Sequence, residues 1–158
     1  MKILLATDGS ECSAEAARSI ANRPWPDGTH VRVVTVTEMP VAIAPESWVL
    51  PEGYYDEIER ASRSSADAAV AEAAKIVADG LGERAVVETA VLEGAPKHAI
   101  VDDAERWGAD LLVVGSHGYT ALERFLLGSV SQSIAHHAKC SVEIVRSPAC
   151  AKSEPERS

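Results

Sequence analysis

Three glycines and a serine form a fixed pattern in the C-terminal half of the chain. Gly115 is followed after two residues by Gly118, and after nine more by Gly128-Ser129. The pattern directly follows the run Asp-Leu-Leu-Val-Val at 110–114, which is typical of a buried strand. Glycines between a strand and a helix let the backbone approach a ligand closely, and a helix N-terminus offers unpaired N–H groups to an anion. The pattern therefore predicts a loop that binds nucleotide phosphates.

The last part of the pattern is expected to begin a helix. The N–H groups of Ser129 and Val130 would face phosphate oxygens, and the Ser129 hydroxyl would add a further hydrogen bond. The alternative is structural: Gly128 ends one short helix and Ser129 caps the next. That alternative leaves Gly115 and Gly118 unexplained, so phosphate binding is favoured for the whole set.

The elements that position this loop alternate between short apolar runs and helical patterns. Such alternation is typical of repeated βα units on a parallel sheet in a single α/β domain. Strands are predicted at Lys2–Thr7, Val31–Thr37, Ala85–Leu92, Asp110–Val114 and Val142–Val145. Helices are predicted around residues 14–21, 66–77 and 100–107 from their apolar stripes, and from about Ser129 to Ala138. The third strand alternates as a less buried strand does, and Gly80 is expected to end the second helix.

A second loop is expected to converge on the same ligand. In an open parallel sheet, ligands bind at the carboxyl ends of the strands where the strand order reverses. The first and fourth strands are predicted to flank that crevice, so Asp8 would accept hydrogen bonds from ribose hydroxyls. The alternative is that Asp8 only caps the first helix, with Glu11 completing a capping box, although Ser10 also suits that role.

Composition limits the classes of partner. The chain has 158 residues, 46% of them hydrophobic, which suits one domain with a substantial core. Its formal net charge of -9 opposes binding to nucleic acid or to an anionic membrane surface. The apolar run at residues 3–6 is too short for a secretory segment and no run approaches 18 apolar residues, so neither export nor membrane anchoring is expected. Three cysteines without C-x-x-C spacing argue against a disulfide framework and for a reducing cytoplasm.

Two stretches fall outside the βα pattern. Residues 38–56 form a long connection that contains Trp48, Tyr54 and Tyr55. This loop either covers a site or meets a partner, or it only packs on its own domain. Residues 147–158 have little apolar surface and are expected to be a disordered tail, which leaves a domain of residues 1–146.

Metal and catalytic sites find little support. His136 and Cys140 are four residues apart and would share a helix face, yet no second cluster supplies further ligands, so no metal site is predicted. His117 has no nucleophile at a recognisable spacing and no carboxylate to orient it, so no catalytic residue is assigned. The chain also lacks the G-x-x-x-x-G-K-[ST] motif of P-loop proteins.

Three segments together carry a family resemblance. They are Ile3-Leu-Leu-Ala-Thr-Asp8-Gly9-Ser10, Gly94-x-Pro96-x-x-x-Ile100, and the segment 110–118 with Gly128-Ser129. Over about residues 1–146 the chain resembles the universal stress protein family, and the glycine motif of its ATP-binding branch is intact. The resemblance implies an open, Rossmann-like sheet of five parallel strands in the order 3-2-1-4-5, with helices on both faces. It also implies a homodimer joined along the last strand.

The resemblance implies a role for each residue of the site. Asp8 and Gly115 would hold the ribose. The phosphates would lie against Gly118, Gly128, Ser129 and Val130, with any Mg or Mn ion carried by the phosphates. The adenine would meet the backbone near Val36, with Ala6, Thr7 and Val114 as neighbours. The last strand departs from the family pattern, because Glu143 interrupts its apolar run and must face solvent or find a cationic partner.

The expected function is regulatory. ATP would act as a bound ligand that biases conformation or partner choice in a stress response, since no general base and no cation aimed at a transferring phosphoryl group is identified. One alternative is a slow ATPase in which His117 or Arg124 assists. Another is a dimerisation module without nucleotide, and AMP or cyclic AMP would suit the same ribose-phosphate site.

Overall fold

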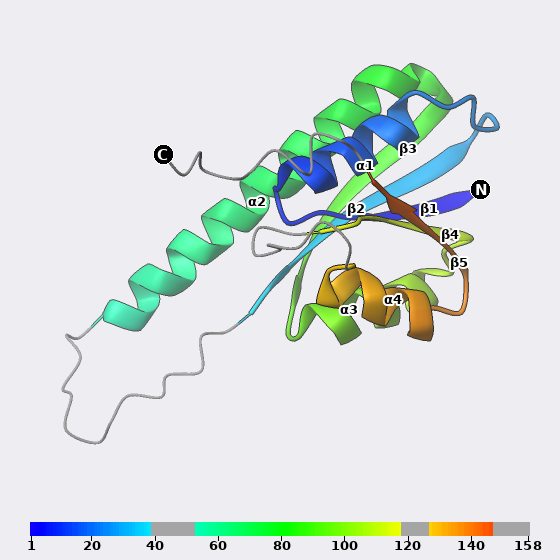
Figure 1. The fold of residues 1–158 in the computed structure, drawn as a ribbon. Helices are drawn as coiled ribbons and strands as arrows, with labels where there is room; N and C mark the ends of the chain where they lie inside the picture. Colours follow the sequence, from blue (N-terminus) through cyan, green and yellow to red (C-terminus); the bar gives the residue numbers. More distant parts are fainter. Residues whose placement is uncertain (39–52, 118–126, 147–158) are drawn as a thin grey trace, which may run out of the picture.

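Five parallel strands form one sheet in the order β3-β2-β1-β4-β5 (Figure 1). The structure is a computed structural model that describes residues 1–38, 53–117 and 127–146. The strands are β1 Lys2–Ala6, β2 Thr29–Thr37, β3 Ala85–Glu93, β4 Leu111–Gly115 and β5 Ser141–Val145. The helices are α1 Glu11–Ala21, α2 Tyr54–Leu81, α3 Pro96–Trp107 and α4 Ser129–His137, with a short 3-10 turn at Gly82–Arg84. The predicted fold class and strand order are confirmed.

The central strand β1 explains where a ligand can bind. The chain adds β2 and β3 on one side of β1 and then crosses to add β4 and β5 on the other side. The strand order therefore reverses between β1 and β4, where Ala6 lies opposite Val114 at the carboxyl ends. This is the switch point at which open α/β sheets bind ligands.

Helices cover both faces of the sheet (Figure 1). On one face α1 and α2 pack over Ile3, Leu5 and Val113, all fully buried. On the other face α3 and α4 pack over Leu4, Val34 and Leu112. Burial on both faces accounts for the continuous apolar runs of the inner strands. No residue of the edge strand β3 is buried, which confirms the prediction of a less buried strand, but half-buried and exposed residues alternate only over its first four positions.

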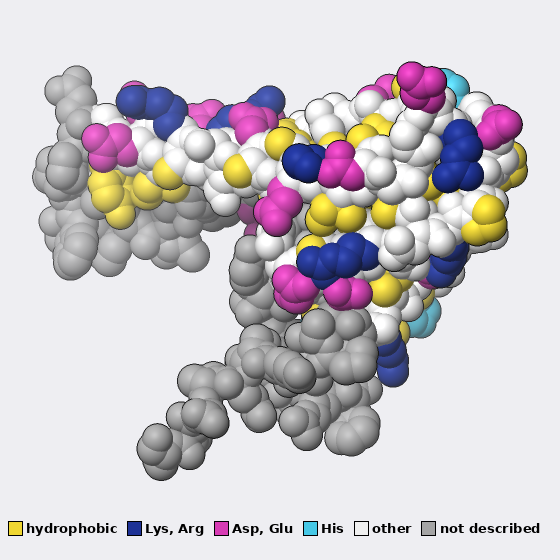
Figure 2. Space-filling model, turned by 90° about the horizontal axis from the view of Figure 1, so that it is seen from above, with side chains coloured by type: hydrophobic (Ala, Val, Ile, Leu, Met, Phe, Trp, Pro, Cys, Tyr) yellow, Lys and Arg dark blue, Asp and Glu magenta, His cyan; other side chains and the backbone are white. Residues whose placement is uncertain are grey.

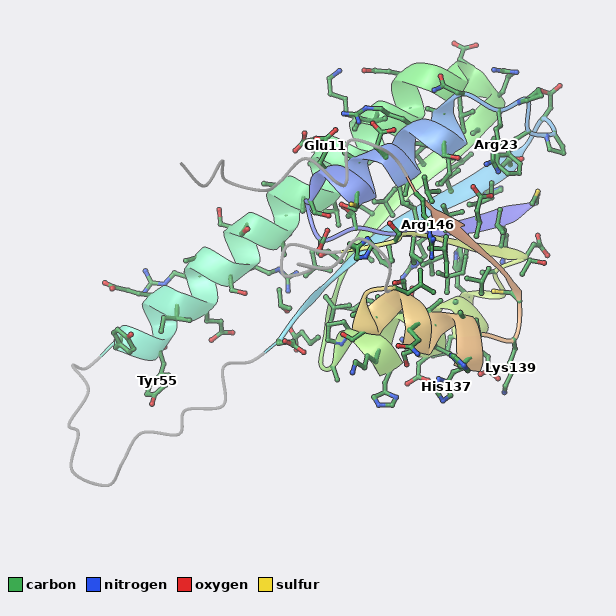
Figure 3. The ribbon with its side chains drawn as sticks, viewed as in Figure 1. Glu11, Arg23, Tyr55, His137, Lys139 and Arg146 are labelled. Carbon is green, nitrogen blue, oxygen red and sulfur yellow. The ribbon has the colours of Figure 1, made fainter. Side chains whose placement is uncertain are left out.

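The helix α2 differs from its prediction at both ends. It begins at Tyr54, so Tyr54 and Tyr55 belong to a helix and not to the long connection. Aromatic residues are weak helix formers, and this hid the first turn. None of its residues before Ala66 is buried, and this part projects past the carboxyl edge of the sheet, with Tyr55 near its tip (Figures 1 and 3). Residues 39–52 of the connection lie outside the described residues.

The prediction that Gly80 ends α2 is wrong. Gly80 lies inside the helix, and Gly82 is the residue that caps it, with a φ of 57°. A Cβ atom on Gly80 would stand 2.6 Å from the Cβ atom of Ala21. The glycine therefore permits the close approach of α1 and α2, a packing requirement that a sequence pattern does not reveal.

The charged residue in β5 finds a cationic partner, as predicted. Glu143 accepts hydrogen bonds from both terminal nitrogens of Arg23, at 2.5 and 2.6 Å, and from the Ser19 hydroxyl at 3.2 Å. Arg23 follows α1, so the pair joins the edge strand to the helix above it. This hydrogen bonding raises the pKa of Arg23 above its usual value.

The surface viewed from the side of α1 and α2 mixes acidic and basic side chains (Figure 2). Among the helices of the described residues, none is long and apolar enough to cross a membrane. The prediction that nucleic acid is not a partner stays a prediction. The predicted disordered tail, residues 147–158, lies outside the described residues.

The cysteines require one correction. Cys140 is a free thiol, and burial raises its pKa, so it is protonated at neutral pH. Cys12 is disulfide-bonded, against the expectation drawn from the cysteine count. An odd number of cysteines argues against a framework of several bridges, but it does not exclude one bridge. A cytoplasmic location stays a prediction.

Candidate nucleotide-binding site

The two ends of the glycine loop are joined by hydrogen bonds. The carbonyl oxygen of Ser116, just after β4, accepts from the Gly128 N–H at 2.9 Å and from the Ser131 hydroxyl at 3.1 Å. The Ser116 N–H donates to the carbonyl of Val145 in β5, also at 2.9 Å. The start of α4 is thereby held against the carboxyl end of β4. Gly118 lies between these ends and outside the described residues.

The N-terminus of α4 offers donors for an anion. Gly128 is the N-cap residue and provides no side-chain cap, and Ser129 is the first residue of the helix. The alternative in which Ser129 caps this helix is therefore wrong. In the part of the chain that the structure describes, no group accepts from the N–H groups of Ser129 and Val130. Unpaired donors at a helix N-terminus are the requirement for phosphate binding.

Asp8 presents an open carboxylate oxygen at the end of β1. Its Oδ1 accepts from the Ser10 N–H at 3.0 Å and from the Ser10 hydroxyl at 2.6 Å. Ser10 is itself the N-cap of α1, accepting from the Ser13 N–H, so the alternative in which Asp8 caps this helix is wrong. The Oδ2 atom of Asp8 has no partner among the described residues, and the side chain is exposed. An oriented carboxylate with one unused oxygen suits a ribose hydroxyl.

Thr7 supports this loop from inside. Its side chain is buried, and its hydroxyl donates to the Ser13 hydroxyl at 3.0 Å and accepts from the Gly9 N–H at 3.2 Å. Gly9 has a φ of 81°, a left-handed conformation that favours glycine. The Thr7 hydroxyl is thus used in shaping the turn that carries Asp8.

Gly115 has a structural reason that the sequence did not reveal. A Cβ atom at this position would stand 2.8 Å from both the carbonyl carbon and the carbonyl oxygen of Cys12, in the first turn of α1. The backbone of β4 therefore touches the backbone of α1, and only glycine leaves room. The structural alternative therefore does explain Gly115, contrary to the expectation, because the packing of α1 against β4 alone requires a glycine here.

The expected neighbours of the adenine share one apolar region. Val114 belongs to the core cluster under α3 and α4, and Ala6 and Val36 pack against it, as does Val130, which is expected at the phosphates. Val36 lies two residues beyond Val34, the β2 residue that pairs with Ala6, and so reaches toward the carboxyl edge. All except Val114 keep part of their surface exposed. Partly exposed apolar side chains beside polar loops suit a purine ring, so the described residues fit an adenine nucleotide.

Two further predictions concern histidines. The expected shared helix face of His136 and Cys140 is wrong, because α4 ends at His137 and Cys140 lies beyond it. Within residues 1–38, 53–117 and 127–146, no three His, Cys, Asp or Glu side chains gather as metal ligands do. The Nδ1 atom of His117 lies 3.0 Å from the Ser116 hydroxyl. Arg124 lies outside the described residues.

Sequence reasoning missed three serines that build the site. Ser10 orients Asp8, Ser116 accepts the bonds that close the glycine loop, and Ser131 supplies one of those bonds. Serine is common in loops and at helix starts, so composition gives no signal for such roles. The position of Ser131, three residues after the N-cap Gly128, is the one cue in the sequence.

Comparisons with known proteins agree with this architecture. The family model described as "Usp: Universal stress protein family" matches residues 1–146 of this chain. Universal stress protein MJ0531 of Methanocaldococcus jannaschii is 34% identical over 93% of this chain and 82% of its own. The structure of the hypothetical protein MJ0577 superposes with a TM-score of 0.77 at 26% identity, over 93% of this chain and 96% of that one. A universal stress protein in complex with cAMP superposes with a TM-score of 0.53 at 26% identity, over 92% and 96% of the two chains. With its switch-point site and a family match that spans both site loops, the chain belongs to the universal stress protein family.

Proposed function

We propose that this protein binds ATP at the switch point between β1 and β4 and acts as a nucleotide-dependent regulatory protein in a stress response. The observation that carries the proposal is the position of α4. The N–H groups of Ser129 and Val130, which have no acceptor among the described residues, stand at the carboxyl end of β4, beside the strand that leads to Asp8. The relative with cAMP bound supports an adenine nucleotide as the ligand class.

Each part of the nucleotide has a partner in this proposal. Asp8 Oδ2 and the backbone at Gly115 take the ribose. The backbone at Gly118 and Gly128, with the donors of Ser129 and Val130, takes the phosphates. The adenine lies over the apolar surface of Ala6, Val36 and Val114, with Thr7 shaping the adjoining turn. A Mg or Mn ion, where present, is held through the phosphates and neutralises part of their charge.

ATP serves as a ligand and not as a substrate in this proposal. The sequence supplies a glycine-rich phosphate loop but no P-loop lysine and no cation aimed at a transferring phosphoryl group. Enzymes that transfer phosphoryl groups normally depend on such cations. Binding to the folded state alone accounts for a regulatory effect, since a ligand that prefers one state shifts the population toward it.

ATP is expected to raise the melting temperature, and a non-hydrolysable analogue is expected to raise it by a similar amount. A ligand that binds only the folded protein adds about 2.7 kcal/mol to the free energy of unfolding at a hundredfold excess over its dissociation constant. Differential scanning fluorimetry with both nucleotides measures this. Mass spectrometry of ligand released from the purified protein identifies which adenine nucleotide is bound.

Single-turnover hydrolysis separates the regulatory proposal from a slow ATPase. The proposal expects no measurable turnover on the timescale of binding. A rate near one per second that is lost in His117→Ala would show that the protein is an enzyme. Absence of any nucleotide-dependent stabilisation would instead favour a dimerisation module.

We also propose a homodimer formed by pairing of the two β5 strands. β5 pairs with β4 on one side, and no described strand pairs with its other side. The Ser141 N–H and the Val145 carbonyl both bond toward β4. Because successive residues of a strand point their N–H groups to opposite sides, the N–H of Ile144 faces the open edge. Symmetric pairing there would cover an apolar edge strand.

Ile144→Pro is expected to give a folded monomer. Proline removes an outward N–H group at Ile144 and leaves the bonds to β4 in place. Glu143→Pro is the contrasting variant, because it removes both an N–H group that faces β4 and the carboxylate that pairs with Arg23, so it is expected to destabilise the fold. Sedimentation velocity reports the oligomeric state and circular dichroism the fold. A wild-type protein that sediments as a monomer at micromolar concentration would contradict the dimer.

A further inference from the structure

We propose that Ser131 is a positioning residue for the phosphate site, acting as a clamp between the two ends of the glycine loop. The inference rests on the proposed function, since it concerns how that site is held in shape. Ser131 contributes its hydroxyl from the first turn of α4, directly after the two residues whose N–H groups are expected to bind phosphate. Its side chain is only 4% exposed, so it acts through its neighbours and not by touching the ligand.

The Ser131 hydroxyl contacts both sides of the loop. Its oxygen lies 3.1 Å from the carbonyl oxygen of Ser116 and 2.9 Å from the carbonyl oxygen of Gly128. Because a hydroxyl carries one proton, the two carbonyls share a single donor. Ser116 is 1% exposed and is bonded to β5, so its carbonyl is a fixed point of the sheet.

The hydrogen bond from Ser131 to Ser116 reinforces the one from Gly128 to Ser116. The Gly128 N–H already bonds to Ser116, but one hydrogen bond leaves the first turn of α4 free to pivot about it. The Ser131 hydroxyl bonds to the same Ser116 carbonyl from a residue three positions further along the chain, so two residues of the helix start are attached to it, and this restricts the direction of the helix start. A phosphate group needs donors at fixed positions, so this direction governs affinity for the phosphates.

Removing the hydroxyl leaves no carbonyl without a partner. In Ser131→Ala, the Ser116 carbonyl keeps the Gly128 N–H, and the Gly128 carbonyl keeps the Gln132 N–H at 2.9 Å. The variant therefore avoids the penalty of a buried unsatisfied group and is expected to fold. This separates the positioning role from a purely structural one.

The test compares the affinities for ATP and for adenosine by isothermal titration calorimetry. Ser131→Ala is expected to weaken ATP binding about three- to tenfold, the effect of one net hydrogen bond. Adenosine, which has the base and ribose but no phosphate, is expected to bind within about twofold of wild type, since the loss is confined to the phosphate site. Ser133→Ala is the matched control on the same helix. The Ser133 hydroxyl lies 3.4 Å from Nδ1 of His137, the last residue of α4, which Figure 3 labels, and neither affinity is expected to change.

Two results would overturn the inference. One is a Ser131→Ala variant that binds ATP as wild type does, whatever its melting temperature. The other is an equal loss of affinity for ATP and adenosine, which would indicate a general effect on the fold. A wild-type protein that binds neither ligand would overturn the proposed function itself, and the two failures are thus distinguishable.

Discussion

Gly115→Ala is expected to lower the free energy of unfolding by about 1–3 kcal/mol, and Gly115→Val by more. The added Cβ atom would stand 2.8 Å from two backbone atoms of Cys12, and 3.0 Å from the Ser13 nitrogen. Backbone atoms of a helix cannot swing away as a flexible side chain does, so α1 must move off β4. That movement also loosens the core beneath α1, where Ala16 and Ala17 are fully buried.

Urea denaturation followed by circular dichroism measures this loss. Gly128→Ala is the matched control, because a Cβ atom there meets the Ser116 carbonyl oxygen only at 3.3 Å. Its free energy of unfolding is expected to fall by less than that of Gly115→Ala, because the closest contact of the added Cβ atom is 3.3 Å and not 2.8 Å. A Gly115→Ala variant as stable as Gly128→Ala would show that α1 and β4 are not so closely packed.

Gly128→Val is expected to weaken ATP binding about tenfold or more while the circular dichroism spectrum stays native. Gly128 has a φ of -57°, which any residue adopts, so the substitution brings no backbone strain. The branched side chain would instead push against the Ser116 carbonyl and the His117 Cα atom, at 3.3 and 3.4 Å from its Cβ atom. This breaks the bond that closes the loop and displaces the donors of α4.

Calorimetry with ATP measures the loss, and a tenfold change corresponds to about 1.4 kcal/mol. Gly128→Ala again serves as the control, with an affinity between those of wild type and Gly128→Val. A folded Gly128→Val protein with wild-type ATP affinity would place the phosphate site elsewhere. The Gly115 and Gly128 variants thus separate two reasons for glycine in one motif, backbone packing at the first and loop closure at the second.

The position of α2 shows how local signals misplace element boundaries. Its apolar stripe from Ala66 to Val77 predicted the helix, because those residues face the sheet and repeat with the helical period. The first turns face no part of the sheet, so no such repeat marks them. The helix begins at Tyr54 after the N-cap Gly53, which has a φ of 87°, and is supported by Asp56 and Glu57 in its first turn.

Some features of the site depend on nearby residues in the sequence, and others depend on contacts between distant segments. The N-cap role of Ser10 and the helix start at Ser129 depend on neighbours within a few residues. For each of these, the sequence left two candidate N-cap residues close together in the chain. The choice between alternatives depended on the hydrogen bonds actually made. Ser10 takes the cap of α1, and this frees Asp8 for another role.

The sequence by itself determined the succession of βα units, the buried strands and the loop that carries Gly128-Ser129. These follow from side-chain periodicity and backbone freedom, which act over a few residues and can be read along the chain. Only the tertiary structure decided that Gly115 is needed by α1, that Glu143 pairs with Arg23, and that Ser131 joins Gly128 to Ser116. Each of these depends on atoms brought together by the fold from distant or differently oriented segments. Contact of that kind leaves no periodic trace in a single sequence.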